Sequence, residues 1–280
     1  MGRTFLCGNV ARDECKVIVV ASRKGGVGKT TTTVNLCAGL AEQTKADGSP
    51  IKVLAIDADS QSALGTSFGV LEADKLSYSL TSVMHSIIAE QDFDPLEGII
   101  HHEEGVDILP SNTSLTNVEL TLVSYIGRET VLKQYIEKVK PHYDVVVIDT
   151  SPNLDLMAIN ALACADSVII PVVPKFLDAI GFKVLLKNVA QIKRQINPTV
   201  DIMGILMTMV DHRTLLAKEI MTSIESAYGD EIRIFNQNIP ISIKASEASA
   251  NGISIFKHAP KCKVAMAYTA FVKEVVYAIG

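Results

Sequence analysis

Short apolar segments rich in β-branched residues alternate along this chain with longer segments in which apolar residues recur at helical spacing. The short segments predict strands at residues 16–21, 52–57, 106–110, 144–150, 167–172 and 202–209. The longer segments predict helices at residues 30–43, 80–89, 128–140, 156–163, 179–195 and 214–228. Because the strands are too apolar to have one face in water, they suit a buried sheet. We therefore expect an α/β fold, a doubly wound, mainly parallel sheet with helices on both faces.

The pattern predicts a single domain over residues 16–280, behind a polar extension at residues 1–15. The composition, 48% hydrophobic and 20% charged, is typical of a globular protein. No stretch approaches the roughly 20 uninterrupted apolar residues of a membrane span, and the first residues lack the apolar core of a signal peptide. We therefore expect a cytoplasmic protein without a membrane segment.

Cysteine spacing and net charge limit the kinds of site and partner that this chain is expected to have. The five cysteines are widely scattered and include no CxxC pair, so the sequence indicates neither a disulfide framework nor a zinc site. A net charge of −5 argues against a uniformly basic nucleic-acid binder. It leaves room for a local basic patch on an otherwise acidic surface.

A glycine-rich segment, KGGVGKTT at residues 24–31, follows the first predicted strand and opens the first predicted helix. Glycines let the backbone bring its N–H groups to phosphate oxygens at a helix N-terminus, where the dipole favours anions. Lys29 would reach the β- and γ-phosphates, and the Thr30 hydroxyl would bind Mg²⁺. The candidate nucleotide-binding residues of this loop are Lys24, Gly25, Gly26, Val27, Gly28, Lys29, Thr30 and Thr31.

The segment departs from the general P-loop pattern, which has glycine where this chain has Arg23. It resembles instead the deviant Walker A motif of the ParA/MinD branch of P-loop ATPases, whose signature is the additional lysine, Lys24. A residue other than glycine before that lysine is more similar to ParA/Soj than to MinD. The resemblance implies ATP and Mg²⁺ as cofactors, slow intrinsic ATP hydrolysis, and a nucleotide-sandwich homodimer in which Lys24 reaches the partner's phosphates.

Two carboxylates end the second predicted strand. At a spacing of two residues, Asp57 and Asp59 point the same way, into the crevice at the carboxyl ends of the strands. The segment resembles the DxDxQ switch region of the family, with Ser60 in place of the usual proline. The resemblance implies that Asp59 positions the attacking water and that Asp57 supports the Mg²⁺ shell. A helix cap or a turn is the alternative interpretation.

The segment YDVVVIDTSP at residues 143–152 predicts a Walker B strand that ends in Asp149. Asp149 would hold Mg²⁺ through water, because this small cation usually keeps several of its waters. The candidate metal-binding residues are therefore Thr30, Asp57 and Asp149, and the resemblance implies Lys24, Lys29 and Asp59 as catalytic residues. The family reads DxPP here, and Ser151 replaces its first proline. An N-cap role for Asp149 is the alternative.

The resemblance extends towards the C-terminus, covering about residues 16 to 278. Residues 204–214 resemble the family's GxxxTMxDxRT segment and residues 239–248 its IPRNVRLSEA segment. They imply an adenine pocket formed by Met209, Pro240 and Ser242; ordinary core at a strand end is the alternative interpretation of Met209. Arg213 and Lys244 match family positions associated with DNA binding without sequence specificity, and Ile241 replaces the usual arginine.

Charge in the C-terminal part supports a DNA-binding surface only weakly. Residues 232–263 carry Arg233, Lys244, Lys257, Lys261 and Lys263 against Glu247, a local charge of +4. Such a patch can contact phosphates but contains nothing that reads base edges. A solvated charged face is the competing interpretation. Elsewhere, the dipeptides at 101–102 (HH) and 103–104 (EE) predict an exposed loop in preference to a metal site.

Three functions are compatible with these motifs, because fold alone does not fix function. The first is a ParA/Soj-type ATPase that partitions plasmids or chromosomes on the nucleoid with a ParB-like stimulator. The second is a MinD-like membrane switch, although the apolar stripe at residues 264, 268, 271 and 275 predicts a docked core helix. The third is an electron-transfer relative resembling nitrogenase iron protein, for which Cys164 is better explained as a core residue.

Overall fold

The computed structural model describes residues 14–175 and 179–280, so the predicted extension at residues 1–15 lies almost entirely outside the described residues. A central sheet runs in the order β3-β4-β2-β5-β1-β6-β7, and every neighbouring pair is parallel except β3 with β4. The strands are β1 (Lys16–Val20), β2 (Val53–Ala58), β3 (Ile100–His101), β4 (Val106–Leu109), β5 (Val145–Thr150), β6 (Ser167–Val172) and β7 (Asp201–Met207).

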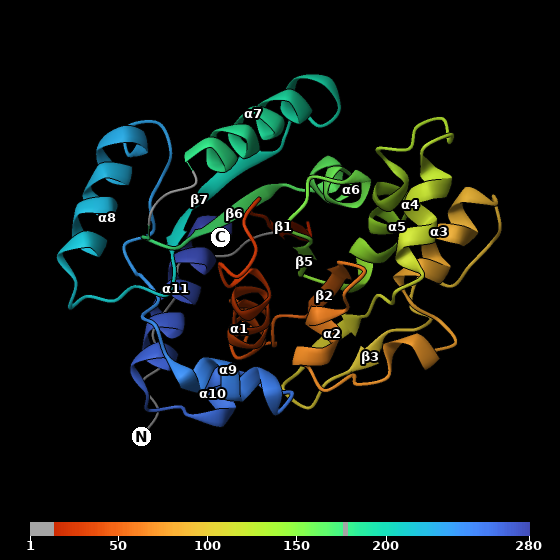
Figure 1. Cartoon of the computed structure of the whole chain (residues 1–280). Coiled ribbons are helices and arrows are strands. Elements are labelled where there is room, and N and C mark those ends of the chain that lie inside the picture. Colours follow the sequence, from red (N-terminus) through yellow and green to blue (C-terminus); the bar gives the residue numbers. More distant parts are fainter. Residues whose placement is uncertain (1–13, 176–178) are drawn as a thin grey trace.

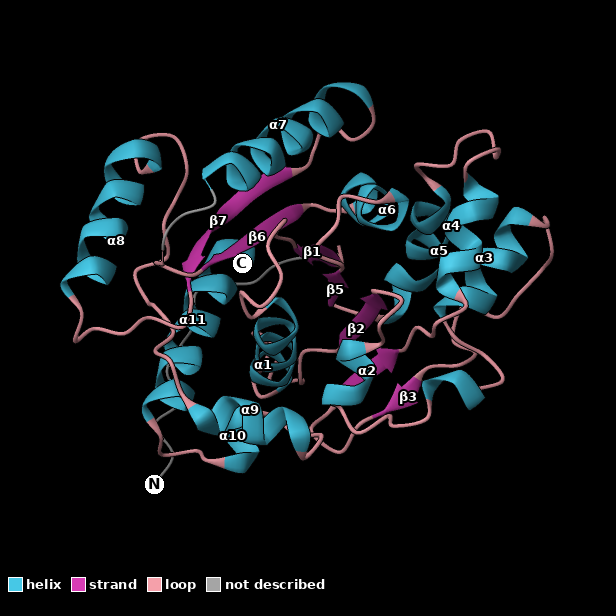
Figure 2. Ribbon diagram, in the orientation of Figure 1, coloured by secondary structure: helices cyan, strands magenta, loops and turns pink. Residues whose placement is uncertain are grey.

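Helices cover both faces of the sheet (Figure 2). They are α1 (Lys29–Ala41), α2 (Ala63–Ser67), α3 (Leu80–Ile88), α4 (Leu115–Leu122), α5 (Val131–Val139), α6 (Leu156–Cys164), α7 (Ala179–Gln195), α8 (Leu215–Tyr228), α9 (Ile243–Ala250), α10 (Ile255–His258) and α11 (Lys263–Ile279). Short 3₁₀ turns lie at Ala73–Lys75 and Lys140–His142. The predicted doubly wound fold is confirmed.

Each face of the sheet has its own apolar core, because side chains alternate along a strand. Val17 and Val19 of β1 pack with α3 to α7, whereas Ile18 and Val20 pack with α1, α10 and α11. Figure 1 shows α1 and α11 on one side of the sheet and α5 and α6 on the other. The central strands are therefore buried on both sides, which explains their nearly continuous apolar sequence.

All six predicted strands and all six predicted helices are present; β6 and α7 have the predicted bounds, and the others differ by one to three residues at an end. The largest shift is at α5, predicted from residue 128: Gly127, at φ +76, starts a turn in which the Thr130 N–H donates to its carbonyl, and the helix begins only after it. The predicted docked helix at the end of the chain is α11. Its stripe is at most 2% exposed, at Val264, Tyr268, Phe271 and Val275.

The pattern did not predict β3, α2, α4, α9 or α10. Four of these five are eight residues or shorter with weak apolar periodicity, and β3 contributes only two residues. Tertiary contacts define such elements more than their own sequence does. Among the described residues, no helix combines the length and the apolar character that crossing a bilayer requires.

Candidate functional site

The glycine-rich loop connects β1, which lies between β5 and β6 inside the sheet, to α1. Gly28 is the N-cap of α1 and has φ +82, a left-handed conformation that suits glycine. Its carbonyl accepts the Thr32 N–H at 2.8 Å, which closes the first turn of the helix. The N-terminus of α1 is thus directed at the loop, as phosphate binding requires.

Two threonines of α1 bind the carboxylate that ends β5. The Thr30 hydroxyl donates to Asp149 Oδ2 at 2.6 Å, and the Thr33 hydroxyl donates to Asp149 Oδ1 at 3.1 Å. Lys29 is 7% exposed, and its Nζ donates to the Lys24 carbonyl at 3.4 Å. The structure therefore brings together the predicted Mg²⁺ pair, Thr30 and Asp149, beside the predicted phosphate lysine.

Asp57 lies on β2 directly beside Asp149 of β5 in the sheet register. Both of its carboxylate oxygens accept backbone N–H groups: Oδ2 accepts those of Leu64 and Gly65 at 3.0 and 3.1 Å, and Oδ1 accepts that of Asp59 at 3.1 Å. Asp57 thereby holds the N-terminal end of α2. The Asp57 side chain thus makes the contacts of the alternative turn role and also lies beside the predicted metal ligand Asp149.

Burial dominates the electrostatics of this site. Together with the nearby Asp149, it raises the pKa of Asp57 to about 8. Burial also raises the pKa of Asp149, against the hydrogen bond from Thr30 and the charge of Lys29. The pKa of Lys29 is lowered by burial despite the two nearby aspartates. Two buried carboxylates close to one cationic lysine favour the arrival of a further cation.

Asp59 follows β2 and is 9% exposed. Its Oδ1 accepts the Gln61 N–H at 3.0 Å, and its backbone carbonyl accepts the Ser111 hydroxyl. Ser111 was not a predicted site residue, because it lies far along the chain, after β4. Asp59 is therefore held in a fixed loop while one carboxylate oxygen has no hydrogen-bond donor among the described residues.

A cavity of about 320 Å³ adjoins the loop at Gly28. Its lining includes all three predicted adenine residues, Met209, Pro240 and Ser242. Met209 has φ +50, which directs its Cε towards Gly28, about 3.5 Å from where a Cβ would lie there. Sequence reasoning missed Tyr268 of α11, a lining residue whose hydroxyl lies 3.3 Å from Thr32 Oγ1.

The wall of this cavity is tied to the glycine-rich loop. The Thr208 hydroxyl donates to the Val27 carbonyl at 2.8 Å, and the Ile239 N–H donates to the Met207 carbonyl at 2.8 Å. The end of β7 therefore holds both the loop and the segment that leads into α9. The GxxxTMxDxRT motif contained Thr208, but the motif alone does not indicate its hydrogen-bond partner.

Comparison with known proteins agrees with this geometry. The family model described as AAA domain matches residues 15–202. The sporulation initiation inhibitor protein Soj of Bacillus subtilis is 34% identical over 93% of this chain and 98% of that protein. The chromosome-partitioning ATPase Soj of Thermus thermophilus is 33% identical over 95% of this chain and 97% of that protein.

This chain belongs to the ParA/Soj family of P-loop ATPases. Among solved structures, it is similar to cobyrinic acid a,c-diamide synthase from Mycobacterium smegmatis with bound ATP analog and magnesium. The TM-score is 0.79 at 30% identity, and the match covers 94% of each chain. The sequence-based recognition of the family is therefore confirmed.

The two predicted DNA-binding residues of this ParA/Soj-family protein are both exposed, but they differ in whether an ion pair holds them among the described residues. The Arg213 side chain is 86% exposed and binds its neighbour Asp211, with Nε to Oδ1 and Nη2 to Oδ2 both at 2.8 Å. This pairing lowers the pKa of Asp211 to about 2. Lys244, in the first turn of α9, is exposed and has no ion pair among the described residues.

The local charge of +4 at residues 232–263 is partly neutralised in the structure by carboxylates from other segments. We call Arg233, Lys244, Lys257, Lys261 and Lys263 the basic patch. Arg233 pairs with Glu274 at 3.1 Å, and Lys257 pairs with Glu103, both carboxylates from outside residues 232–263. Three lysines of the basic patch remain without an ion pair in the part of the chain that the structure describes.

The prediction of an exposed loop at residues 101–104 is wrong for three of its residues, because His101 belongs to β3 and two others are half-buried. The His101 side chain is 82% exposed, but those of His102 and Glu104 are only 11% and 12% exposed. Both are half-buried against the segment between α9 and α10. Within residues 14–175 and 179–280, no group of three or more histidine, cysteine, aspartate or glutamate side chains is placed to hold a metal ion.

Two observations bear on the alternative functions. The apolar stripe of α11 is buried in the core, so it is not available to lie on a membrane. Cys164 is 6% exposed, and burial raises the pKa of its thiol to about 12, which opposes the thiolate form that an iron–sulfur ligand needs. Neither alternative is favoured by these side chains.

Proposed function

We propose that this protein binds ATP with Mg²⁺ and hydrolyses it slowly to drive plasmid or chromosome partition. The observation that carries the proposal is the hydrogen bond from Thr30 to Asp149 beside a loop that opens, at Gly28, into a cavity of about 320 Å³. This volume lies within the range of small-ligand sites. Phosphate, metal and base would thus be held by one continuous surface.

Each side chain of the site has a distinct task in this proposal. Lys29 and the backbone of the loop bind the phosphates, and Thr30 and Asp149 hold Mg²⁺, whose preferred ligands are hard oxygens. The bound cation supplies charge neutralisation at the phosphates. Asp57 supports the metal site indirectly, because its oxygens already accept three backbone N–H groups. Asp59 orients the attacking water through its second carboxylate oxygen.

Dimerisation follows from the position of Lys24. This lysine is exposed at the open side of the loop, while its own carbonyl is bound by Lys29. We infer that two chains enclose two nucleotides and that each Lys24 neutralises phosphate charge across the interface. The form with ATP is then a dimer, and the forms without nucleotide or with ADP are monomers.

The platform for the dimer is DNA bound without sequence specificity. Lys244 and Arg213 supply the phosphate contacts, and dimerisation places two such surfaces on one particle, which raises affinity through effective concentration. A centromere-binding partner of the ParB kind stimulates hydrolysis and releases the dimer. The protein would then work in the cytoplasm on the nucleoid.

Sedimentation of the full chain with MgATP, MgADP or no nucleotide tests this function. We expect a dimer with MgATP alone, best seen in the hydrolysis-deficient Asp59→Ala variant, and DNA binding only under the same condition. A monomer at saturating MgATP would contradict the sandwich dimer. A dimer that fails to retain unrelated duplexes at low salt would exclude DNA as its platform.

A further inference from the structure

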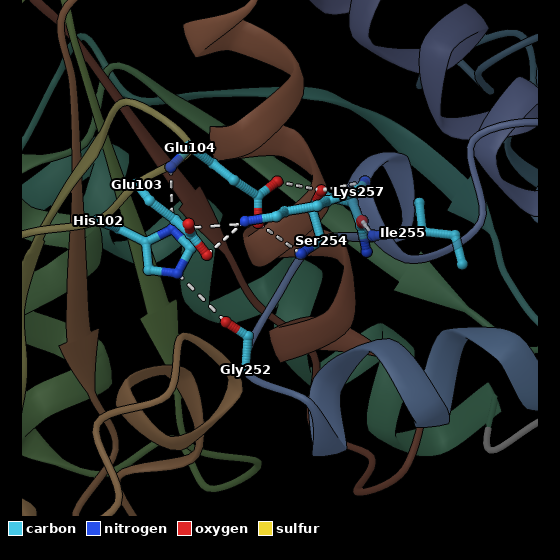
Figure 3. Close-up of polar contacts among 8 residues, drawn as sticks. His102, Glu103, Glu104, Gly252, Ser254, Ile255 and Lys257 are labelled. Atoms are coloured by element: carbon cyan, nitrogen blue, oxygen red, sulfur yellow. Dashed lines mark hydrogen bonds and ion pairs between the residues drawn. The ribbon is translucent and has the colours of Figure 1, made fainter.

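The turn between β3 and β4 contacts the segment between α9 and α10 (Figure 3). This turn is far from the glycine-rich loop in sequence. Glu104 accepts the Ser254 N–H at 2.8 Å and also the Ser254 hydroxyl. His102 Nε2 lies 3.2 Å from the Gly252 carbonyl, and its Nδ1 lies 3.3 Å from the Glu104 N–H. A neutral ring with its proton on Nε2 satisfies both contacts.

The same segment is bound from a second side by the helix that starts at the glycine-rich loop. Asn35 of α1 is 3% exposed, and its Oδ1 accepts the Ile255 N–H at 2.8 Å. The Asn35 amide in turn donates to the Thr31 carbonyl at 2.7 Å. The start of α10 is therefore held between the phosphate-binding helix and the turn that carries Glu104.

A third contact comes from α2, which begins at the N–H groups bound by Asp57. Gly69 follows α2 and touches Gly252 backbone to backbone: a Cβ on Gly252 would lie 2.7 Å from the Gly69 Cα. Gly252 also has φ +69, so both space and conformation favour glycine there. The Phe68 ring packs edge-on against His102, with 5.0 Å between ring centroids.

The opposite end of α9 lies at the proposed base pocket. Ser242 caps α9, and Ile243, Ala245 and Ser246 line the cavity that begins at Gly28. With eight residues, the helix is about 12 Å long. A shift at its Gly252 end therefore changes the pocket at its Ser242 end, because a single short helix connects them.

We propose that His102, Glu104 and Gly252 form a positioning clamp that sets the place of α9 and thereby the affinity for the nucleotide base. None of the three lines the cavity, so they act through α9 and are positioning residues. The inference rests on the proposed nucleotide site. It assigns a task to a half-buried pair, His102 and Glu104, that neither phosphate binding nor metal binding uses.

Two ligands separate the clamp from general stability: MgATP, which occupies both the loop and the base pocket, and magnesium tripolyphosphate, which occupies the loop alone. Calorimetric titration of the full chain gives the preference for MgATP. We expect Glu104→Ala to lower this preference by about tenfold, the scale of one lost hydrogen bond to a charged group, and His102→Phe, which loses a bond between neutral groups, to lower it by about fivefold. The affinity for tripolyphosphate should stay unchanged.

The matched control is Glu103→Ala, because Glu103 belongs to the same turn but pairs with Lys257 on the surface. It should keep the wild-type preference. His102→Phe keeps a ring against Phe68 and loses the bond to Gly252, whereas Glu104→Gln keeps one acceptor for Ser254 and should lose less than Glu104→Ala. If Glu104→Ala does not fold, these two milder variants decide the result.

An unchanged preference in the folded variants would overturn the clamp, and so would equal weakening of both ligands, which is the result of general destabilisation. Failure of the underlying site looks different. Wild-type protein that binds MgATP no better than tripolyphosphate would refute the base pocket before any variant is measured.

Discussion

Around the glycine-rich loop Lys29, Asp57 and Asp149 are buried and held by hydrogen bonds, whereas the cations of the basic patch are all exposed and two of them pair with carboxylates from distant segments. Asp149 is fully buried and accepts two threonine hydroxyls. On the basic patch, Glu274 and Glu103 neutralise two of the five cations. The first arrangement fixes positions to within a hydrogen bond, while exposed ion pairs are weak and exchange easily. Nucleotide chemistry needs the former, and DNA binding without sequence specificity tolerates the latter.

We expect the largest effect from Lys29→Ala, which tests whether the buried side chains around the loop bind the nucleotide. Since Lys29 is buried and is the proposed main phosphate contact, its loss should weaken MgATP binding by about 100-fold, the upper range for a charged hydrogen bond. Calorimetric titration measures this. Lys52→Ala serves as the control, because Lys52 is exposed and precedes β2, at the end of the strands away from the glycine-rich loop. This variant should bind MgATP as the wild type does. Equal affinities in both variants would show that Lys29 does not contact the nucleotide.

Asp59→Ala separates binding from chemistry. We expect it to bind MgATP and to dimerise as the wild type does, because Asp59 is not assigned to the phosphates. Turnover with a stimulating partner should fall by about 100-fold, as when one transition-state contact is removed. A steady-state phosphate-release assay supplies the rate. Full stimulated turnover in this variant would remove Asp59 from the catalytic assignment.

On the exposed side, single substitutions should have smaller and unequal effects. Lys244 has no ion pair among the described residues, whereas Arg213 already binds Asp211 through two hydrogen bonds. Lys244→Ala should therefore weaken ATP-dependent DNA binding by about tenfold, and Arg213→Ala should weaken it less. Gel-shift titration at two salt concentrations measures both.

The double variant Arg213→Glu with Lys244→Glu should lose DNA retention and keep ATP-driven dimerisation. Wild-type DNA affinity in that variant would direct attention to Lys261 and Lys263 of the basic patch. A larger loss from Arg213→Ala than from Lys244→Ala would mean that the pairing with Asp211 is released on DNA.

The smallest effect concerns stability and pH in the protein without nucleotide. Burial raises the pKa of Asp149 to about 6 and that of Asp57 to about 8, above the ordinary value of 3.8. Protonation of these carboxyls therefore stabilises the fold fully below pH 3.8, and the contribution is lost as the pH rises through the folded-state values. Asp149→Asn should raise the Tm at pH 8, with a gain that shrinks towards pH 5.

Thermal unfolding at both pH values checks this expectation, with Asp92→Asn on the exposed surface as the control. A change of 1 kcal/mol corresponds to roughly 2–4 °C in a chain of this size. A Tm of Asp149→Asn below that of the wild type at pH 8 would show that the hydrogen bonds from Thr30 and Thr33 outweigh the burial of charge.

The sheet, and the neighbourhood of Thr30 and Asp149, could be predicted from the sequence for a physical reason. A loop between a buried strand and a helix is local in sequence, so the residues that make Gly28 an N-cap and direct Thr30 at the loop lie next to one another. Asp149 was predictable because parallel strands end at the same edge of a sheet. In contrast, the partners of Lys257, Tyr268 and Glu104 lie about 150 to 240 residues away. No local pattern indicates such contacts.

The two margins of the sheet limit how copies of this protein can associate. At one margin β3 adds only two residues, in the antiparallel sense, and at the other Ile205 of β7 exchanges backbone hydrogen bonds with Arg233 and Phe235. Little backbone on either margin is left to pair with a strand from another molecule. The covered margins oppose growth into β-aggregates, and copies of this protein that associate would meet through loops and helices.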